Sequence, residues 1–192
     1  SKFPPQVRLA RAKSKTLLLD TIPDENANQA FIQQMYFKDN TSLSSMLEPA
    51  LFKRLSSIII DYGVESNQID RVKPWAAFSI IGRPKPVRAP SLETNLYKLG
   101  QQSLLQVRSL ESMEEIISAL DGLSMDDQII ILKDTICNHE QIVRDSKKLL
   151  DLYIASDLAG LVAFNRQPHY DEAVFDRFMQ RVLYDRNDIM LE

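Results

Sequence analysis

The sequence predicts an α/β fold that is predominantly helical, with short buried strands at about 16–22 and 104–110 in an α/β core surrounded by many helices. Both stretches are short and rich in leucine, which is typical of strands covered on both faces. The second stretch passes directly into a helical pattern from Met113 to Leu120, with its apolar residues on one side. Strand, tight turn and helix together form half of a βαβ unit.

The rest of the chain carries helical patterns separated by proline, glycine or capping residues. Pro49 in the first turn and Gly63 just past the end frame an amphipathic helix. Pro74 and Gly82 frame a shorter apolar helix, in which Trp75 is expected to anchor the core. We expect an extended entry at 3–5, a loop at 83–90, and helices at 7–13, 28–37, 49–62, 67–72, 75–81, 92–99, 112–121, 125–136, 142–154, 158–164 and 171–183.

Several helix ends are predicted by their capping residues. Ser112 to Glu115 fits the Ser-x-x-Glu capping box, in which each side chain satisfies a backbone donor at the helix start. Ser91 and Ser124 are expected to cap the helices that follow them. Gly100 and Gly122 are expected to stop the helices that precede them.

Composition limits the classes of protein to which the chain can belong. Its 192 residues suit one domain, and 44% hydrophobic with 26% charged residues is ordinary for a folded protein. The net charge of −3 supplies no strong field for nucleic acid, and no RNA-binding signature is present. No apolar run approaches the ~20 residues of a membrane span. Cys137 is the single cysteine, which excludes an intrachain disulfide.

Two acidic residues are the best candidates for a site. Glu111 follows the second strand and Asp20 lies near the end of the first, where open α/β sheets bind their ligands. If the strands are neighbours, the two acids could act as metal ligands or acid/base groups. The alternative is that each caps the next helix or pairs with a nearby cation. Arg186 could clamp a carboxylate or phosphate, or form a surface ion pair.

Other catalytic signatures are absent from the sequence. A zinc hydrolase commonly uses two histidines close together on one element, whereas His139 and His169 lie far apart. We expect both to be ordinary surface or helix-end residues. Arg83, Lys85 and Arg88 are expected to belong to a solvated loop. The chain contains no nucleophile elbow, Walker loop or dinucleotide fingerprint, so no complete catalytic set is recognisable.

Several stretches match family motifs in a fixed order. They are Phe3-Pro4-Pro5-Gln6-Val7 with 12–20, Lys73-Pro74-Trp75-Ala76, Ser91-Leu92-Glu93 through Gly100, 109–115, Tyr153 with Asp157-Leu158, and Arg186-Asn187-x-x-Met190. Together they resemble the TraB/GumN family, which includes the Tiki-type proteins and is related more distantly to the ChaN and erythromycin-esterase folds. The resemblance covers nearly the whole chain.

The resemblance implies a Tiki-like, metal-dependent peptidase or hydrolase fold. Its proposed chemistry rests on two Gly-x-x-His motifs, one before the segment matching Ser1 and the other after the segment matching Met190. Neither motif is in this sequence, so we expect 1–192 to be one domain that is incomplete at both ends and inactive alone. No cofactor is evident in this chain, and the resemblance implies that a complete family member could bind a divalent metal. The retained site candidates are Asp20, Glu111 and Arg186, with aspartate where the family usually has glutamate.

The alternative function is a non-catalytic helical binding or assembly module. It would use helical faces such as 51–62 or 175–183, and a homo-oligomer is one form of it. A third reading is a small-molecule or phosphate pocket built from Arg186 and the basic loop. The substrate would be a peptide or a small molecule. Bacterial family members are often exported, so the resemblance implies an extracytoplasmic location, periplasmic or secreted.

Overall fold

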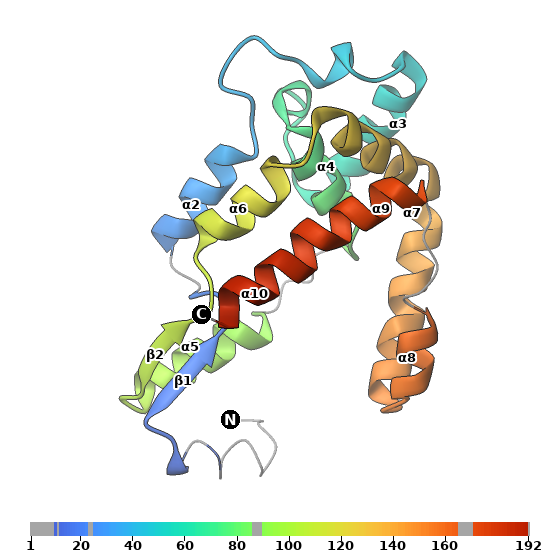
Figure 1. The fold of residues 1–192 in the computed structure, drawn as a ribbon. Helices are drawn as coiled ribbons and strands as arrows, with labels where there is room; N and C mark the ends of the chain where they lie inside the picture. Colours follow the sequence, from blue (N-terminus) through green and yellow to red (C-terminus); the bar gives the residue numbers. More distant parts are fainter. Residues whose placement is uncertain (1–9, 11, 23–24, 86–89, 165–170, 192) are drawn as a thin grey trace.

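The computed structural model describes residues 10, 12–22, 25–85, 90–164 and 171–191, and it confirms the predominantly helical α/β fold (Figure 1). In chain order the described helices and strands are β1 (Thr16–Leu19), α2 (Glu25–Gln34), α3 (Pro49–Ile59), α4 (Pro74–Ile81), α5 (Leu92–Gln102), β2 (Gln106–Ser109), α6 (Met113–Asp121), α7 (Met125–Ile154), α8 (Leu158–Phe164), α9 (Glu172–Met179) and α10 (Asp185–Leu191). Short 3₁₀ turns lie at Leu43–Ser45, Ile60–Tyr62 and Ile69–Arg71, and a π turn lies at Gln180–Tyr184.

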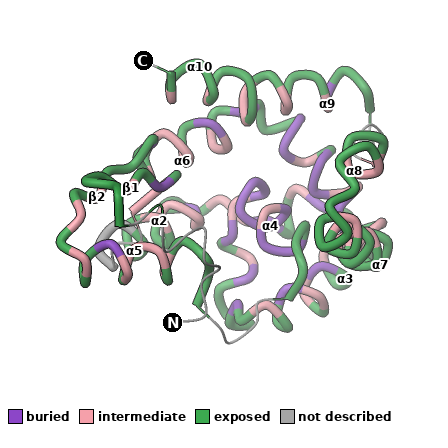
Figure 2. The backbone as a smooth tube through the Cα atoms, turned by 90° about the horizontal axis from the view of Figure 1, so that it is seen from below, coloured by how far each residue is buried: buried purple, intermediate pink, exposed green. Residues whose placement is uncertain are grey.

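Helix α4 is the centre of the core. Every residue of this helix except Ser79 is buried, as expected for a helix that is apolar nearly all round. Figure 2 shows the buried residues concentrated on α4 and on the parts of neighbouring helices that face it. The fully buried side chains around Trp75 include Leu55 and Ile59 of α3 and Leu132 and Ile136 of α7. Trp75 is therefore the core anchor that was predicted.

The two strands pair in parallel, with Leu17 opposite Val107 and Leu19 opposite Ser109. Their burial was predicted wrongly. Leu17 and Leu19 share one face, which is half-buried to buried, whereas Leu18 on the other face is 58% exposed. Helix α5 packs against one face of the sheet, and no described element covers the other, so alternate residues remain in solvent. Both strands are also shorter than the apolar runs that predicted them.

Gly100 does not stop α5, contrary to the prediction, because the helix continues to Gln102. A Cβ atom built on Gly100 would lie 2.8 Å from Cδ2 of Leu17 and 3.1 Å from Cγ2 of Val107. Glycine at this position therefore allows α5 to approach the sheet closely. Gly63, in contrast, ends its helical run as predicted, with a left-handed φ of 92°.

One predicted break between helices and one predicted helix end are not observed. The stretches 125–136 and 142–154 belong to one helix, α7, which continues through the residues between them. His139 is therefore a half-buried residue inside a helix, contrary to the predicted surface or helix-end position. The last helix does not end near 183, since it passes through the π turn into α10. Arg186 accordingly lies within a helix. The predicted helix at 67–72 is only the 3₁₀ turn Ile69–Arg71.

The predicted capping residues are confirmed where the structure describes them. Ser112 Oγ accepts from the N–H of Glu115 at 3.2 Å, while Glu115 Oε2 accepts from the N–H of Ser112 at 2.6 Å. Ser91 caps α5 and Ser124 caps α7 in the same way. Gly122 follows the last residue of α6.

Some predictions lie outside the described residues: the extended entry at 3–5, most of the helix at 7–13, Arg88 and His169. In the part of the chain that is described, no helix combines the length and the apolar character needed to cross a membrane.

Candidate functional site

The candidate site lies at the carboxyl ends of β1 and β2. Because the strands are parallel, both end at the same edge of the sheet. The pairing continues past them, since the N–H of Leu110 donates to the carbonyl of Leu19 at 2.8 Å and the N–H of Glu111 donates to that of Asp20 at 3.1 Å. Asp20 and Glu111, the two acids predicted from the sequence, are therefore neighbours on adjacent paired segments of the sheet edge.

The environments of the two carboxylates differ. Glu111 is only 5% exposed, whereas Asp20 is exposed to solvent. Nε of Arg186 donates to Oε2 of Glu111 at 2.9 Å, and Nη2 of the same guanidinium donates to Oε1. This bidentate geometry fixes the orientation of the buried carboxylate and compensates its charge. Nη1 of Arg186 also donates to the carbonyl of Val182 at 3.1 Å.

These contacts show how Glu111 and Arg186 are engaged in the fold. Glu111 does not cap α6, because Ser112 and Glu115 do so. The hydrogen bond from the backbone N–H of Ser112 lowers the pKa of Glu115 below its ordinary value. Arg186 forms an ion pair with a buried partner rather than a surface pair or an open anion site.

Two further arginines attach the same helical run to the core, and sequence reasoning missed both. Arg177 donates from Nε and Nη2 to the two oxygens of Asp127, at 2.9 and 2.6 Å. Arg181 donates to the carbonyls of Ala119 and Ser118, each at 3.0 Å. The hydrogen bond from Arg177 holds the pKa of the buried Asp127 below its ordinary value. The four-residue spacing of the two arginines was the available signal.

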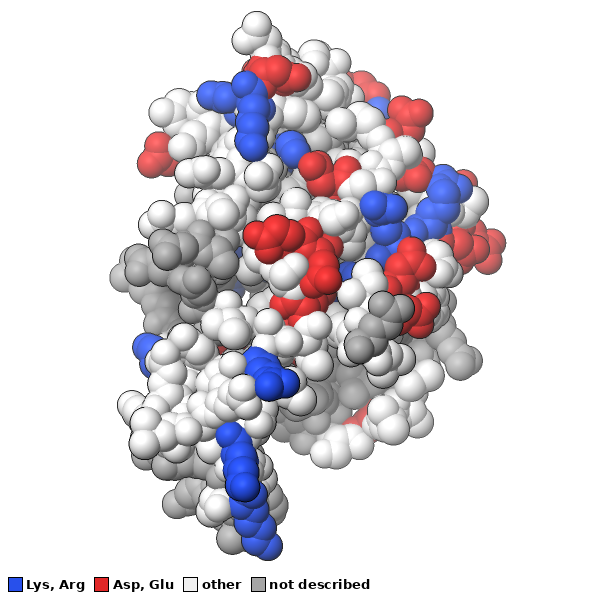
Figure 3. All heavy atoms as spheres, turned by 60° about the vertical axis from the view of Figure 1, so that its left-hand side comes forward, with Lys and Arg blue, Asp and Glu red and all other residues white. Residues whose placement is uncertain are grey.

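A small hollow of about 210 Å³ borders the ion pair. Its lining includes Glu115, Ser118, Arg181, Asp185 and Arg186. Figure 3 shows Asp and Glu side chains gathered near the middle of the face that carries α2 and α6. This side of the molecule therefore offers carboxylates to solvent beside the bound guanidinium groups.

The described residues do not form a metal centre by themselves. Among them, no three His, Cys, Asp or Glu side chains gather closely enough to hold a metal ion. Both oxygens of Glu111 already accept hydrogen bonds from Arg186. The exposed carboxylate of Asp20 is therefore the more accessible oxygen ligand for a metal at this edge. His139 is engaged elsewhere, since its Nδ1 lies 3.0 Å from the carbonyl of Ile81.

The described part of the basic loop, which includes Arg83 and Lys85, does not join this site. Lys85 pairs with Asp61 at 2.6 Å, with both side chains more than half exposed. The hydroxyl of Tyr62 donates to the carbonyl of Arg83 at 2.8 Å. Lys85 and Arg83 are thus engaged at the end of α3, and the predicted solvated loop is the better description of them.

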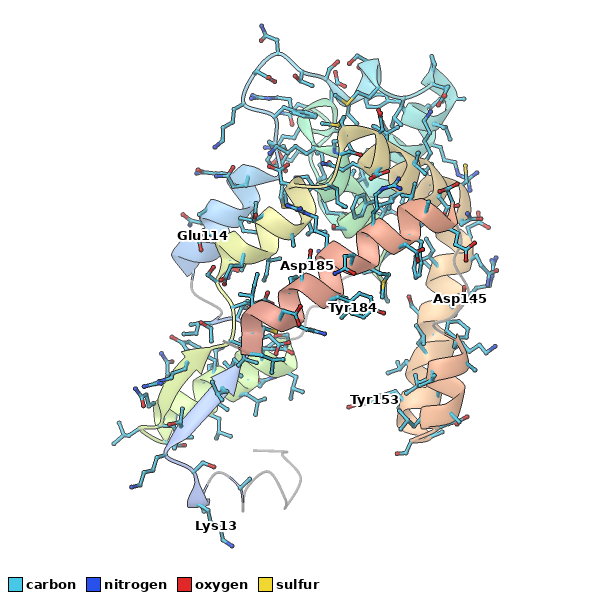
Figure 4. The ribbon with its side chains drawn as sticks, viewed as in Figure 1. Lys13, Glu114, Asp145, Tyr153, Tyr184 and Asp185 are labelled. Atoms are coloured by element: carbon cyan, nitrogen blue, oxygen red, sulfur yellow. The ribbon has the colours of Figure 1, made fainter. Side chains whose placement is uncertain are left out.

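A second, apolar groove of about 550 Å³ lies on another side of the molecule. Phe78 of α4, Leu149 of α7, Phe164 of α8 and Phe178 of α9 are among its lining residues. Beyond it, the end of α7 and helix α8 form a projecting hairpin, which we call the arm (Figure 1). Figure 4 shows Tyr153 near the tip of the arm, pointing to the side on which α10 lies.

Comparison with known sequences identifies the chain. The sequence model described as the TraB/PrgY/gumN family matches residues 1–192, which is the whole chain. The chain belongs to the TraB/PrgY/gumN family. A search of curated proteins and of solved structures finds no match to it.

In this TraB/PrgY/gumN family member, the stretch at 73–76 that carried part of the resemblance contacts the end of α6 and the start of α7. Nζ of Lys73 donates to Asp121 at the end of α6 at 2.8 Å. The N–H of Trp75 donates to Oε1 of the buried Gln128 at 3.1 Å. The family motifs around Trp75, Glu111 and Arg186 thus meet along α6 and its two ends.

Proposed function

We propose that this chain forms the carboxylate-bearing sheet edge of a Tiki-like, metal-dependent peptidase fold, with Asp20, Glu111 and Arg186 lining the site. One observation carries the proposal: two acids follow paired parallel strands at one edge, and an arginine fixes one of them. Ligand sites in open α/β sheets lie at this edge. Family membership is the second support.

The three residues have different roles in this proposal. Arg186 orients Glu111 and neutralises it, so the pair forms a rigid boundary of the site. Asp20 is exposed and can approach a bound peptide directly, as a hydrogen-bond acceptor or an acid/base group. A divalent metal, where a family member binds one, would polarise the peptide carbonyl or a water molecule.

We further propose that the 192-residue chain does not cleave peptides by itself. The support is chemical: neither Gly-x-x-His motif is in the sequence, and the described carboxylates are not arranged as a metal centre. The chain would then contribute substrate-facing groups without the complete reaction machinery.

The test combines binding with turnover. A mixture of unstructured peptides is added to the ¹⁵N-labelled chain, with and without Mn²⁺, Co²⁺ or Zn²⁺. We expect amide shifts that cluster at Asp20, Leu110 and Glu111, weaker shifts in Asp20→Asn, and no cleavage by mass spectrometry. Metal-dependent cleavage would refute the proposed inactivity. Shifts that avoid this edge, or that are unchanged in Asp20→Asn, would refute the site.

A non-catalytic assembly module is the second candidate, and the exposed arm favours it. The helical faces first expected to form an interface do not suit it, because Leu55 and Ile59 are buried and Phe178 packs edge-on against Phe78. On the arm, Tyr153 and Leu158 are each 72% exposed. We propose that a second copy of the chain would cover them. Sedimentation velocity should then show a dimer that Leu158→Glu dissociates, and a monomer at every concentration would remove this candidate.

A further inference from the structure

Three arginines of the run from α9 to α10 bind three successive places: the start of α7, the end of α6 and the residue before the cap of α6. We call Arg177, Arg181 and Arg186 the arginine ladder. Arg177 binds Asp127 in the first turn of α7, Arg181 binds carbonyls in the last turn of α6, and Arg186 binds Glu111 just before α6 begins. Figure 1 shows α10 and α9 lying alongside α6. The ladder therefore spans the whole length of α6.

The spacing within the ladder does not suit a regular α-helix. Arg177 and Arg181 are four residues apart, but Arg181 and Arg186 are five apart. An α-helix turns about 100° per residue, so residues four apart differ by about 40° and residues five apart by about 140°. In a regular helix, Arg186 would point away from α6 while Arg181 pointed toward it.

The π turn at Gln180–Tyr184 removes this conflict. The N–H of Asp185 donates to the carbonyl of Gln180, five residues earlier, as in a π-helix. A side-chain contact shows the same alignment, because Nε2 of Gln180 donates to Oδ1 of Asp185 at 2.6 Å. Residues five apart thus share a face here. The extra residue in this turn brings Arg186 into line with Arg181.

We infer that Arg181 is a positioning residue for the Glu111–Arg186 pair, and that the π turn sets the register between them. The guanidinium of Arg181 binds the carbonyls at the carboxyl end of α6, where a cation is favoured by the helix dipole. This contact fixes the turn just before Arg186 relative to the helix that follows Glu111. The role of Arg181 as a positioning residue rests on the proposed function. The register that the π turn sets between Arg181 and Arg186 does not depend on it.

Gly122 provides the space that the guanidinium of Arg181 occupies at the end of α6. A Cβ atom at this position would lie 1.8 Å from Nη2 of Arg181, so any side chain would displace the guanidinium. The φ of Gly122 is −82°, which other residues adopt readily. Space for Arg181, rather than backbone freedom, accounts for glycine here.

The test measures the integrity of the Glu111–Arg186 ion pair and not catalysis. Its failure and that of the proposed function are therefore distinguishable. Hydrogen exchange at Nε of Arg186 is measured by NMR on the ¹⁵N-arginine-labelled chain, with Arg186→Lys assigning the signal. Arg181→Ala removes two hydrogen bonds to the end of α6, and we expect exchange to accelerate at least roughly tenfold. Circular dichroism should show that the helices remain. Arg177→Ala is the matched control and should leave the exchange rate unchanged.

Changes in register make the test sharper. Deletion of the exposed Tyr184 leaves Arg181 and the following arginine four apart, so a regular helix should keep the signal protected. Insertion of one alanine after Tyr184 should abolish protection. Equal acceleration in Arg177→Ala and Arg181→Ala would overturn the positioning role of Arg181. Loss of protection in the deletion variant, or its retention in the insertion variant, would overturn the register.

Discussion

The guanidinium of Arg186 holds both oxygens of Glu111, although the two residues lie at opposite ends of the chain's second half. This contact joins α10 to the carboxyl end of β2. It also places the last helix beside the edge on which Asp20 lies. The family motifs at 109–115 and 186–190 thus belong to one structural unit.

Breaking this pair should destabilise the chain strongly. In Arg186→Ala the carboxylate of Glu111 stays buried without a partner, and we expect the free energy of unfolding to fall by about 3–5 kcal/mol. Urea unfolding measures this loss. In the matched variant that replaces Glu111 and Arg186 together by leucine, no unpaired charge remains and the loss should be smaller. Equal losses in the two variants would contradict the argument.

The contact between Asp127 and Arg177 predicts a pH dependence. The hydrogen bond from Arg177 lowers the pKa of Asp127 in the folded state below its unfolded value of about 4. The contact therefore stabilises the fold above about pH 4, and its contribution disappears as the pH falls through the lowered folded value. We expect the wild-type thermal midpoint to fall more steeply than that of Arg177→Ala when the pH is lowered below about 4. Parallel curves would show that the pair does not contribute.

Gln128 should be essential to the start of α4. Its Oε1 accepts from the N–H of Trp75, and its Nε2 donates to the carbonyl of Leu123 at 2.9 Å. Gln128→Leu leaves both backbone groups unpaired in the core, at about 1–3 kcal/mol each. Trp75 is the single tryptophan, so its fluorescence can follow urea unfolding. A Gln128→Leu variant as stable as wild type would refute this assignment.

The effect of Gly100→Ala on stability should change sign when the neighbouring side chains on the sheet are shortened. Alanine improves helix propensity by about 1 kcal/mol, but overpacking against the sheet costs about 1–3 kcal/mol. We therefore expect a net loss of stability in the wild type, where the new Cβ meets Leu17. In a background that carries both Leu17→Ala and Val107→Ala the two close contacts are absent, and the same substitution should stabilise the chain. A thermodynamic cycle by chemical unfolding measures the difference, and equal effects in both backgrounds would contradict close approach of α5.

The local signals of the sequence were sufficient for part of this fold. The capping box at Ser112–Glu115 and the apolar helix at Pro74–Ile81 depend on residues within a few positions of one another. Such short-range hydrogen bonds and steric preferences act in any context, so they could be predicted. The placement of Glu111 and Asp20 at strand ends was predicted by the same local reasoning.

Only the tertiary structure decided which side chains pair with one another and which faces of these elements are buried. Nothing near Leu18 in the chain indicates that one face of the sheet faces solvent, because burial depends on which elements pack there. The pairing of Glu111 with Arg186 needs a helix 75 positions away and an extra residue in its π turn. The sequence by itself determined where helices start and which acids end strands. Long-range packing decided which arginine holds which acid, because register between distant segments is a property of the whole fold.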